Sequence, residues 1–527
     1  MSVNSIRNLL EIAYEKNPNK TALVDKDGSL TYEELFAKVN QVALYLDQLN
    51  LPFGSRVGIY GHKDIAKVIS ILGVLSTSYV FVPITRLLKA EQVQHIIDDC
   101  NVSCMITDAA KLELIQKIGF EGKVICTQSV DDPNIVSFDE IYKCFSHEYT
   151  CSIKGHNNAA ITYSFSTGGL PKGVVISHRN FMDGARVVSK YLHLQDNDVI
   201  SGLLSFSVDY GLNQIFCSLY KQATFAIYTF LTPGDFFMYL IKQKVTVLPL
   251  MPIHLSQMFD EDVHRLPDPV QLQDIRIITS SGGNVTPKMM NKTDEYFSKA
   301  QFYYMHGLSE AFRSAYLNPT QLKIRPTSIG KAIPDVDLYV INEQGKECAP
   351  REVGELIHRG AGIYKGYWNS KVETNTRFKS IQILKNVVDL GSDLIDEIVV
   401  ASGDYVYKDE EGYIYFVGRH DDMIKSGGYR INPLEIETVV YNNISSIEKC
   451  AVFGIDNEDI EEEIVLVYQA NKQLAKNELL LELKQHLPIY MVPSRIIFKQ
   501  QLPMMVQDHD KINKKSLKDE VINLESL

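Results

Sequence analysis

The chain has 527 residues, of which 45% are hydrophobic and 22% are charged, and its formal net charge is −12 at pH 7. A chain of this length is too long for one compact core and predicts two or more domains. The acidic balance argues against nucleic acid or an anionic membrane as the main partner. The N-terminal residues lack the apolar region of a secretory signal, and no apolar segment is long enough to span a membrane, so we expect a cytoplasmic location.

The first part of the chain alternates short β-rich runs with helical patterns. TALVDKDGSL predicts two strands around an Asp-Gly turn, and Thr31 is the expected N-cap of the helix that follows. Strand-like runs separated by helices predict parallel strands covered on both faces. The strongest of these runs are RVGIYG, SCMITD, GKVICT, ATFAIY and VTVLPL.

The second part of the chain changes character twice. DLYVINEQG, GELIHRG and GYIYFVGR predict a smaller β-rich unit, and after GRHDDMIKSGGYRI helices and strands alternate over a stretch long enough for a separate small domain. We therefore predict an α/β protein. Its large N-terminal domain, residues 1–420, would combine layered α/β subdomains with the β-rich subdomain. A small mobile C-terminal α+β domain, residues 421–527, would follow.

The stretch YSFSTGGLPKGV has features of a phosphate-binding loop. Glycines let backbone N–H groups approach an anion, hydroxyls add donors, and Lys172 supplies a positive charge where the loop enters a predicted strand. Because the spacing differs from that of the standard P-loop, the stretch alone is more typical of a turn with a surface lysine than of a phosphate loop.

Two further motifs place acidic side chains near predicted strands. In YYMHGLSEAF, Ser309 and Glu310 follow a strand and suit a phosphate with its Mg²⁺, although Ser309 could instead cap a helix. In SGDYVYKDEEGYIYFVGR, Asp404 stands at the expected end of a strand, and Arg419 follows a hairpin. An aspartate can accept both hydroxyls of a ribose, and an arginine can hold a phosphate. The tail DHDKINKKSLKDE alone resembles a solvated charge run.

Taken in order, these motifs resemble the signature blocks of the adenylate-forming superfamily, which includes acyl-CoA synthetases, peptide-synthetase adenylation domains and beetle luciferases. YSFSTGGLPKGV resembles its phosphate loop, HGLSE its Y-G-x-T-E block, SGDYV its T-G-D block, and GRHDDMIKSGGYRINPLEIE its hinge block. DKINKKSL resembles the block around the terminal lysine, and the likeness covers almost the whole chain. HGLSEAFRSAYL and PTSIGKAIP also resemble bacterial exosortase-associated AMP-forming acyl-CoA ligases.

The resemblance implies a ligase with two half-reactions. A carboxylic or amino acid reacts with ATP to give an acyl-adenylate and pyrophosphate, and the thiol of CoA or of carrier-protein phosphopantetheine then displaces AMP. Lys511 would bridge the carboxylate and the α-phosphate, Glu310 would bind Mg²⁺, and Ser309 would bind the α-phosphate. Asp404, helped by Arg419, would hold the ribose. The other implied nucleotide contacts are Ser164, Ser166, Thr167, Gly168, Gly169, Lys172, Gly282, Gly283, His306, Gly307 and Arg430.

The family's C-terminal domain rotates between the half-reactions, and Asp421 falls at its hinge position. The chain departs from the pattern at Phe165 and Gly168, which replace a small residue and a threonine in the phosphate loop and would weaken phosphate binding if the lost hydroxyl matters. Asp510 replaces the glycine before Lys511. Lys514, three residues further on, is the second candidate for the catalytic lysine.

The acid substrate is indicated only by LSFSVDYGLNQ, which resembles a block of amino-acid-activating domains and places Asp209 where an α-amino group is bound. A buried carboxylate there needs a cationic partner. The alternative is that Asp209 caps the following helix. At the level of the whole protein, the alternatives to a ligase are a degenerate nucleotide-binding member without turnover and a luciferase-like oxygenase.

Overall fold

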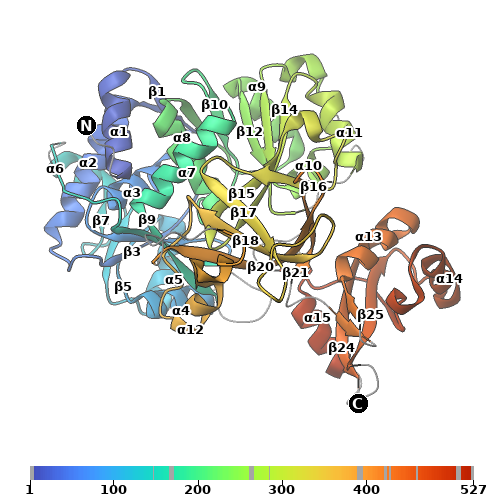
Figure 1. Cartoon of the computed structure of the whole chain (residues 1–527). Helices are drawn as coiled ribbons and strands as arrows, with labels where there is room; N and C mark the ends of the chain where they lie inside the picture. The colour runs from blue at the N-terminus through green and yellow to red at the C-terminus, as the bar shows by residue number, and fades with distance from the viewer. Residues whose placement is uncertain are drawn as a thin grey trace.

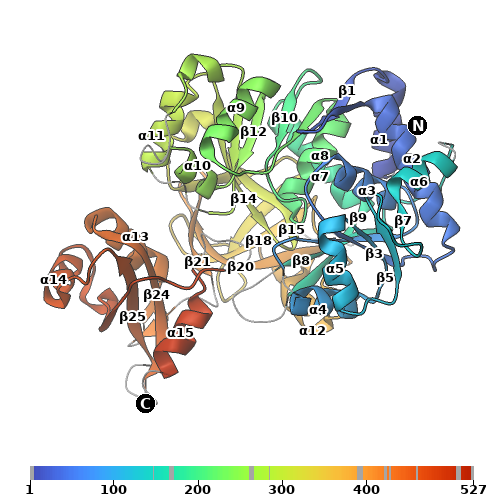
Figure 2. The same ribbon diagram turned by 180° about the vertical axis from the view of Figure 1, so that it is seen from behind.

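The computed structural model describes residues 5–88, 90–145, 148–164, 171–259, 266–283, 285, 287–388, 396–419, 424–426, 429–457, 461–505 and 512–523. Two large sheets and their helices form the main body, and a smaller unit made by the C-terminal part of the chain lies to one side of it (Figures 1 and 2). Among the described residues, no helix combines the length and the apolar character that crossing a bilayer requires.

A seven-stranded sheet carries much of the N-terminal part, with all its described strand pairs parallel except the β8–β9 pair. Its two faces are both covered, because Phe81 packs into one apolar cluster while its neighbours Val80 and Val82 pack into another. The strands lie in the order β7 (Val136–Ser137), β6 (Lys123–Cys126), β5 (Val102–Thr107), β3 (Arg56–Tyr60), β4 (Val80–Ile84), β8 (Asn158–Ser164) and β9 (Lys172–Ser177). The helices of this region are α2 (Tyr32–Gln48), α3 (Ile65–Leu75), α4 (Ala90–Cys100), α5 (Ala109–Lys117) and α6 (Phe138–Cys144).

A 14-stranded sheet continues through the centre of the molecule and changes from parallel to antiparallel pairing along its width. The parallel part is β14 (Gln301–Leu308), β13 (Ile277–Ser280), β12 (Val247–Leu250), β10 (Val199–Gly202), β11 (Thr224–Ile227) and β1 (Thr21–Val24), with β2 (Ser29–Thr31) added antiparallel. The antiparallel part is β15 (Ala311–Leu317), β16 (Ser328–Ala332), β21 (Ile414–Arg419), β20 (Ile398–Lys408), β18 (Gly354–Gly360) and β17 (Val336–Ile341), with β19 (Phe378–Ser380) on β20.

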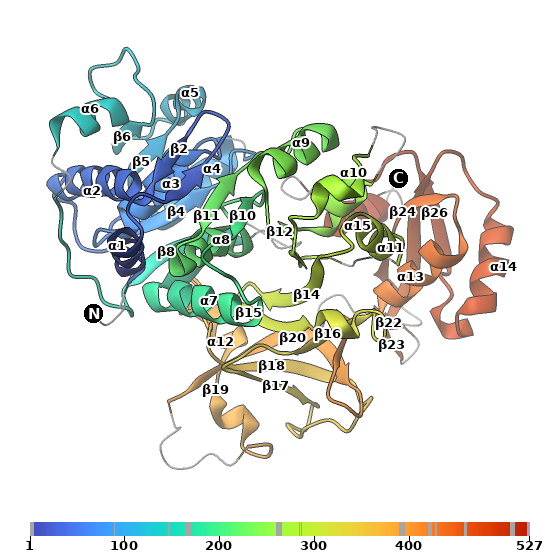
Figure 3. The ribbon, with the colours of Figure 1, turned by 90° about the horizontal axis from the view of Figure 1, so that it is seen from above.

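The helices of this second region are α1 (Ile6–Lys16), α7 (His178–Tyr191), α8 (Asp209–Lys221), α9 (Pro233–Gln243), α10 (Pro252–Met258), α11 (Pro287–Tyr296) and α12 (Lys371–Arg377), with short 3-10 turns η1 (Pro269–Leu272), η2 (Pro319–Gln321) and η3 (Ile381–Leu384). Successive residues of β12 pack on opposite faces of this sheet, because Val247 joins one apolar cluster and Leu248 joins another. The two kinds of pairing meet at the β14–β15 hairpin, near the middle of the molecule in Figure 3.

The C-terminal part forms a five-stranded sheet with an apolar core on each face. Along β24, Cys450 and Val452 pack with α13 and α14, whereas Ala451 and Phe453 pack with α15. The side chain of Asn432 donates to the carbonyl of Val417 and so links this unit to the end of β21. The elements are β22 (Ile424–Ser426), β23 (Tyr429–Ile431), α13 (Pro433–Asn443), β24 (Ile447–Asn457), β25 (Glu461–Ala470), α14 (Lys476–His486), η6 (Ile489–Met491), β26 (Arg495–Lys499) and α15 (Lys514–Asn523).

The structure confirms the predicted α/β class and most of the predicted elements. Thr31 caps α2 in a capping box with Glu34, as its place before the helical pattern predicts. Two local predictions are wrong. Asp404 lies inside the eleven-residue strand β20 rather than at a strand end. Ser309 lies in the turn of an antiparallel hairpin and caps no helix.

Candidate active site

His306, Asp404 and Arg419 come from three strands and meet at one carboxylate. Asp404 on β20 pairs directly with Arg419 on β21 across the ladder, and Arg419 Nε lies 3.1 Å from Asp404 Oδ1. His306 on β14 contacts the second carboxylate oxygen, with Nε2 3.1 Å from Asp404 Oδ2. A carboxylate has about four acceptor positions, so Asp404 keeps acceptor capacity for a ligand.

The Asp404 carboxyl is held in its charged form although it is almost wholly buried, with a side-chain exposure of 3%. Burial acts to raise its pKa, but the hydrogen bonds and charges of His306 and Arg419 outweigh burial and hold the pKa below the usual 3.8. An ionised carboxylate that keeps acceptor positions free beside these two contacts is suited to accept a pair of hydroxyl groups.

Glu310 lies in the turn between β14 and β15 and is 6% exposed. The Tyr367 hydroxyl donates to its Oε1, while its Oε2 is buried and has no hydrogen-bond partner in the described part of the chain. Burial is the main cause that raises the pKa of the Tyr367 hydroxyl above its ordinary value, and the charge of Glu310 raises it further. The hydroxyl therefore stays protonated and donates.

The unpartnered Glu310 oxygen fits a bound cation, because a buried carboxylate oxygen without a partner is costly. Among the described residues no group of three or more His, Cys, Asp or Glu side chains could hold a metal ion. A Mg²⁺ ion held by one carboxylate together with substrate phosphates meets both observations.

Gly282 and Gly283 follow β13 and lie beside the strand that carries His306. Gly282 has φ +89°, a left-handed conformation that favours glycine, and both residues are exposed. The Tyr304 hydroxyl donates to the Gly283 carbonyl at 3.0 Å, and Tyr304 shares a face of β14 with His306 because they are two residues apart. Next to His306, Gly307 sits at an irregularity of the β14–β15 register. Four of the predicted nucleotide contacts, Gly282, Gly283, His306 and Gly307, are therefore neighbours.

The predicted phosphate loop is bracketed by the β8–β9 hairpin, in which Ser164 pairs with Lys172. Lys172 begins β9, which confirms the predicted lysine at the loop's entry into a strand. Its ammonium forms an ion pair with Glu373 on α12, and both side chains are about a third exposed, at 38% and 35%. The Trp368 N–H donates to the Gly173 carbonyl at 2.7 Å, so the segment that carries Tyr367 runs beside this strand.

Asp209 is the first residue of α8 and not its cap, since the N-cap is Val208 and forms no side-chain cap bond. One carboxylate oxygen, Oδ1, accepts the Tyr210 N–H at 2.7 Å. Burial raises the pKa of the Asp209 carboxyl, while the Arg313 charge and the Tyr210 N–H oppose that rise.

Several predicted site residues lie outside the described residues, namely Ser166, Thr167, Gly168, Gly169, Asp421 and Lys511. Arg430 lies in β23, of which the backbone alone is described at that position. Lys514, the second candidate for the catalytic lysine, has Nζ 2.7 Å from Glu437 Oε1 and donates to the Val452 carbonyl at 3.3 Å. Lys514 is thus engaged inside the C-terminal unit.

Sequence reasoning missed four residues of this region: Tyr304, Arg313, Tyr364 and Tyr367. The segment GELIHRGAGIYKGYWN carries two of these tyrosines, Tyr364 and Tyr367, but its sequence alone assigns no role to either ring. Their contacts with Glu310 and with the neighbouring hairpin depend on how distant segments pair, which the motif does not encode.

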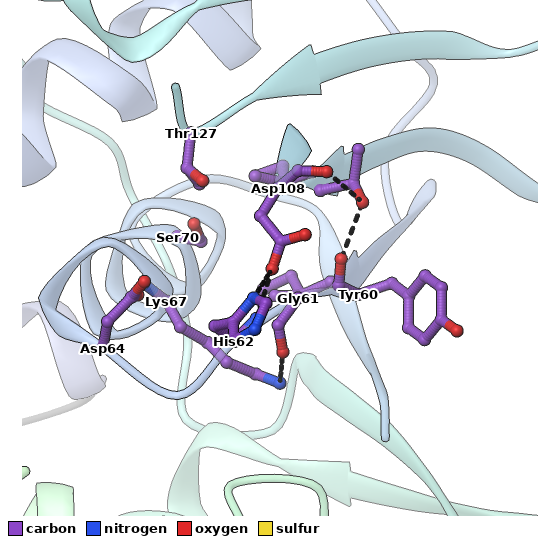
Figure 4. Close-up of a pocket in the computed structure, with 11 residues that line it drawn as sticks. Tyr60, Gly61, His62, Asp64, Lys67, Ser70, Asp108 and Thr127 are labelled. Atoms are coloured by element: carbon purple, nitrogen blue, oxygen red, sulfur yellow. Dashed lines mark hydrogen bonds and ion pairs between the residues drawn. The ribbon is translucent and has the colours of Figure 1, made fainter. Parts of the chain in front are cut away.

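A separate pocket opens at the ends of β3 and β5 in the seven-stranded sheet (Figure 4). His62 Nδ1 lies 2.5 Å from Asp108 Oδ2, and Lys67 donates to the Gly61 carbonyl at 3.2 Å. Asp108 also caps α5 through the Lys111 N–H. These groups satisfy one another and belong to the packing of that sheet, so we assign them no part in the reaction.

Known proteins that are similar in sequence align with almost the whole length of this chain. Tyrocidine synthase 1 from Brevibacillus parabrevis is 26% identical over 519 residues, which cover 97% of this chain and 45% of the relative. Gramicidin S synthase 1 from Brevibacillus brevis is 25% identical over 518 residues, covering 97% of this chain and 44% of the relative. The chain thus spans less than half the length of these curated relatives.

Solved structures match the whole fold. The anthranilate CoA ligase AuaEII in complex with anthranoyl-AMP aligns with a TM-score of 0.84 at 21% identity, covering 100% of this chain and 99% of that one. The o-succinylbenzoate CoA synthetase MenE from Bacillus subtilis, in complex with ATP and a magnesium ion, aligns with a TM-score of 0.82 at 21% identity, covering 97% and 99%. The family model described as AMP-binding enzyme matches residues 10–368, and the chain belongs to this AMP-binding, adenylate-forming family.

Proposed function

We propose that this chain is an AMP-forming ligase that adenylates a carboxylic or amino acid and passes the acyl group to a thiol. The observation that carries the proposal is the buried Oε2 of Glu310, which has no partner among the described residues and lies in the hairpin whose His306 contacts the Asp404 carboxylate. One group suits a cation, and the other suits a pair of hydroxyls. Together they match the needs of a nucleoside triphosphate with its metal.

In the first half-reaction, an oxygen of the substrate carboxylate attacks the α-phosphorus of ATP, and the bond to pyrophosphate breaks. Asp404 would hold the ribose hydroxyls, and Lys172 with the preceding loop would hold the leaving phosphates. Glu310 would hold Mg²⁺, which would offset the negative charge of the phosphates and of the incoming carboxylate. Tyr367 would fix the orientation of Glu310 through its hydrogen bond.

In the second half-reaction, the thiol sulfur attacks the carbonyl carbon, AMP leaves, and the thiol proton passes to solvent. We propose that residues 421–527 rotate about Asp421 between the two steps, so that Lys511 leaves and Arg430 approaches. The C-terminal unit has apolar cores of its own, which supports such a rotation. The acceptor would be CoA or the phosphopantetheine of a carrier protein.

The reaction is tested by isotope exchange between pyrophosphate and ATP across a panel of fatty, aryl and amino acids. We expect exchange that depends on one class of acid and on Mg²⁺. A folded protein that binds ATP but gives no exchange with any acid would refute the ligase and favour a binding protein without turnover, for which the comparisons offer no support.

The Lys172–Glu373 ion pair predicts an effect on ATP affinity. Binding of phosphates to Lys172 must compete with the Glu373 carboxylate, so Glu373→Gln is expected to tighten ATP binding about two- to fivefold at low salt, in line with the small strength of exposed pairs. Calorimetric titration with ATP at two salt concentrations measures this. Lys172→Met, as the matched control, should weaken ATP binding, and a Glu373→Gln variant that binds more weakly would contradict the competition.

The Asp404 carboxylate predicts a pH-dependent contribution to stability. Its folded-state pKa is lower than 3.8, so its charged form stabilises the fold above pH 3.8, and this contribution is lost as the pH falls through the folded-state value. Asp404→Asn should lower the free energy of unfolding at neutral pH by about 1–3 kcal/mol, and the deficit should shrink in acid. Urea unfolding of both proteins at neutral pH and below pH 3.8 measures this difference in the free energy of unfolding. A difference that does not change with pH would contradict the prediction.

A further inference from the structure

Arg313 lies three residues after Glu310 on β15 and is 4% exposed. Its Nη1 donates to Ser281 Oγ at 2.9 Å, and its guanidinium lies over the Tyr210 ring at 4.7 Å from the centroid. Its Nε is buried and has no hydrogen-bond partner within the described ranges. A guanidinium has five donors and a full positive charge, so one neutral hydroxyl and two rings, those of Tyr210 and Phe312, leave most of its donors unused.

Asp209 lies beside this cation with the opposite charge. It directly precedes Tyr210, whose ring carries the guanidinium on one face and whose hydroxyl lies 2.7 Å from Thr279 Oγ1. The Arg313 charge acts on the Asp209 carboxyl and opposes the rise of its pKa that burial causes. The carboxylate and the guanidinium therefore belong to one cluster.

Tyr364 completes the cluster and connects it to the reaction centre. Its ring is 4% exposed, and its hydroxyl is buried without a partner among the residues that the structure describes. The charges of Asp209 and Arg313 both act on this hydroxyl. The Tyr364 N–H donates to the Glu310 carbonyl at 3.0 Å, so the cluster adjoins the turn that carries the proposed metal ligand.

Unpartnered polar atoms are concentrated at this place. They are Arg313 Nε and the Tyr364 hydroxyl, both of which are buried without a partner among the described residues. Since native interiors pair nearly all of their buried polar groups, such a concentration marks the binding position of a polar ligand. The charges of Asp209 and Arg313 act on each other, and a ligand that places a cation against Asp209 and an anion against Arg313, in addition to the carboxylate that reacts with ATP, would give each charge a partner in direct contact.

We propose, on the basis of the ligase function above, that the substrate is an amino dicarboxylic acid. Its ammonium group binds Asp209, its second carboxylate binds Arg313 and the Tyr364 hydroxyl, and its remaining carboxylate faces Glu310 and ATP. A neutral acid would add no anion in direct contact with the buried guanidinium. A dicarboxylic acid without the amine would bring further negative charge to the cluster and no cation for Asp209.

The test is pyrophosphate–ATP exchange with amino dicarboxylic acids of increasing chain length, their side-chain amides, unbranched neutral amino acids and the matching dicarboxylic acids without the amine. We expect kcat/KM for one amino dicarboxylic acid to exceed that of its amide at least 100-fold, because the amide leaves a buried charge unpaired. Arg313→Met should raise KM for this acid by about 100-fold and bring its kcat/KM close to that of the amide, and Arg313→Lys should recover part of the loss.

Matched variants separate recognition from folding. Arg351→Met removes an arginine that is 70% exposed and paired with Glu410, and it should change nothing. Tyr364→Phe removes only the unpartnered hydroxyl and should raise KM for the same acid about five- to tenfold with kcat kept, which tests the cluster even if Arg313→Met fails to fold. Asp209→Asn should abolish the preference for the amine over the dicarboxylic acid that lacks it.

The outcomes distinguish the two proposals. If exchange is fastest with a neutral amino acid, a fatty acid or an aryl acid and the Tyr364 variant does not change KM, the amino dicarboxylic substrate is refuted and the ligase stands. If no acid of any class gives exchange, the ligase is refuted and the substrate proposal falls with it.

Discussion

Glu310→Gln is expected to lower the rate of acid-dependent pyrophosphate exchange by about 10²–10³-fold. The change removes the negative charge from a carboxylate whose Oε2 is buried and unpartnered within the described residues, while the Oε1 contact with Tyr367 is kept by the amide oxygen. Because the loss concerns Mg²⁺, the variant should need a much higher Mg²⁺ concentration for half-maximal exchange. A titration of exchange rate against Mg²⁺ measures it.

Tyr367→Phe is the matched control for this prediction. It keeps the ring and its edge-on contact with Phe378, at 6.0 Å between ring centroids, and removes only the hydrogen bond that orients Glu310. We expect an intermediate loss of about 10–100-fold, as for other groups that orient a metal ligand. A Glu310→Gln variant with the Mg²⁺ dependence of the wild type would show that Glu310 does not bind the metal.

Lys511→Ala is expected to lower the exchange rate by about 10²–10³-fold and to leave the thermal stability unchanged. The reason is the proposed bridge between two anions, which one ammonium group must supply during adenylation. Lys514→Ala is expected to lower the stability and to keep most of the exchange activity. Its ammonium lies 2.7 Å from Glu437, whose side chain is 9% exposed, so its removal leaves a buried carboxylate without its cation.

The two lysine variants are compared by exchange kinetics and by urea unfolding. Lys514→Ala should lower the free energy of unfolding by about 1–3 kcal/mol and keep most of the exchange activity. If Lys511→Ala retains exchange while a folded Lys514→Ala loses it, the assignment of the catalytic lysine is wrong and Lys514 takes its place.

The sequence predicts those parts of the fold that depend on a local residue pattern. Buried strands such as RVGIYG and VTVLPL and the Thr31–Glu34 capping box depend on residues close together in the chain, so their period and their capping residues predict them. Ser309 was harder, because a hydroxyl before an acid fits a helix start and a hairpin turn equally well. Ser309 lies in a turn because β14 pairs antiparallel with β15, and the residues HGLSE alone do not predict that pairing.

The candidate site was predictable to the extent that it resembles a family, and less so beyond it. Glu310, Asp404 and Arg419 stand at motif positions, and the last two meet across one strand pair. Arg313 and Tyr364 follow the motifs but belong to none of their fixed positions, and their meaning comes from burial and missing partners. Such properties arise only when residues far apart in the chain, such as Tyr210 in α8 and Arg313 in β15, pack together.

The central claim is that the chain cleaves ATP between the α- and β-phosphates in a reaction that consumes an acid. Incubation with ATP, Mg²⁺, the acid that gives the fastest exchange, and CoA or pantetheine, followed by chromatography of the nucleotides, tests it most directly. We predict AMP and pyrophosphate in equal amounts, matched by acyl thioester and absent when the acid is left out. Formation of ADP and phosphate, or of AMP at the same rate without any acid, would contradict the account.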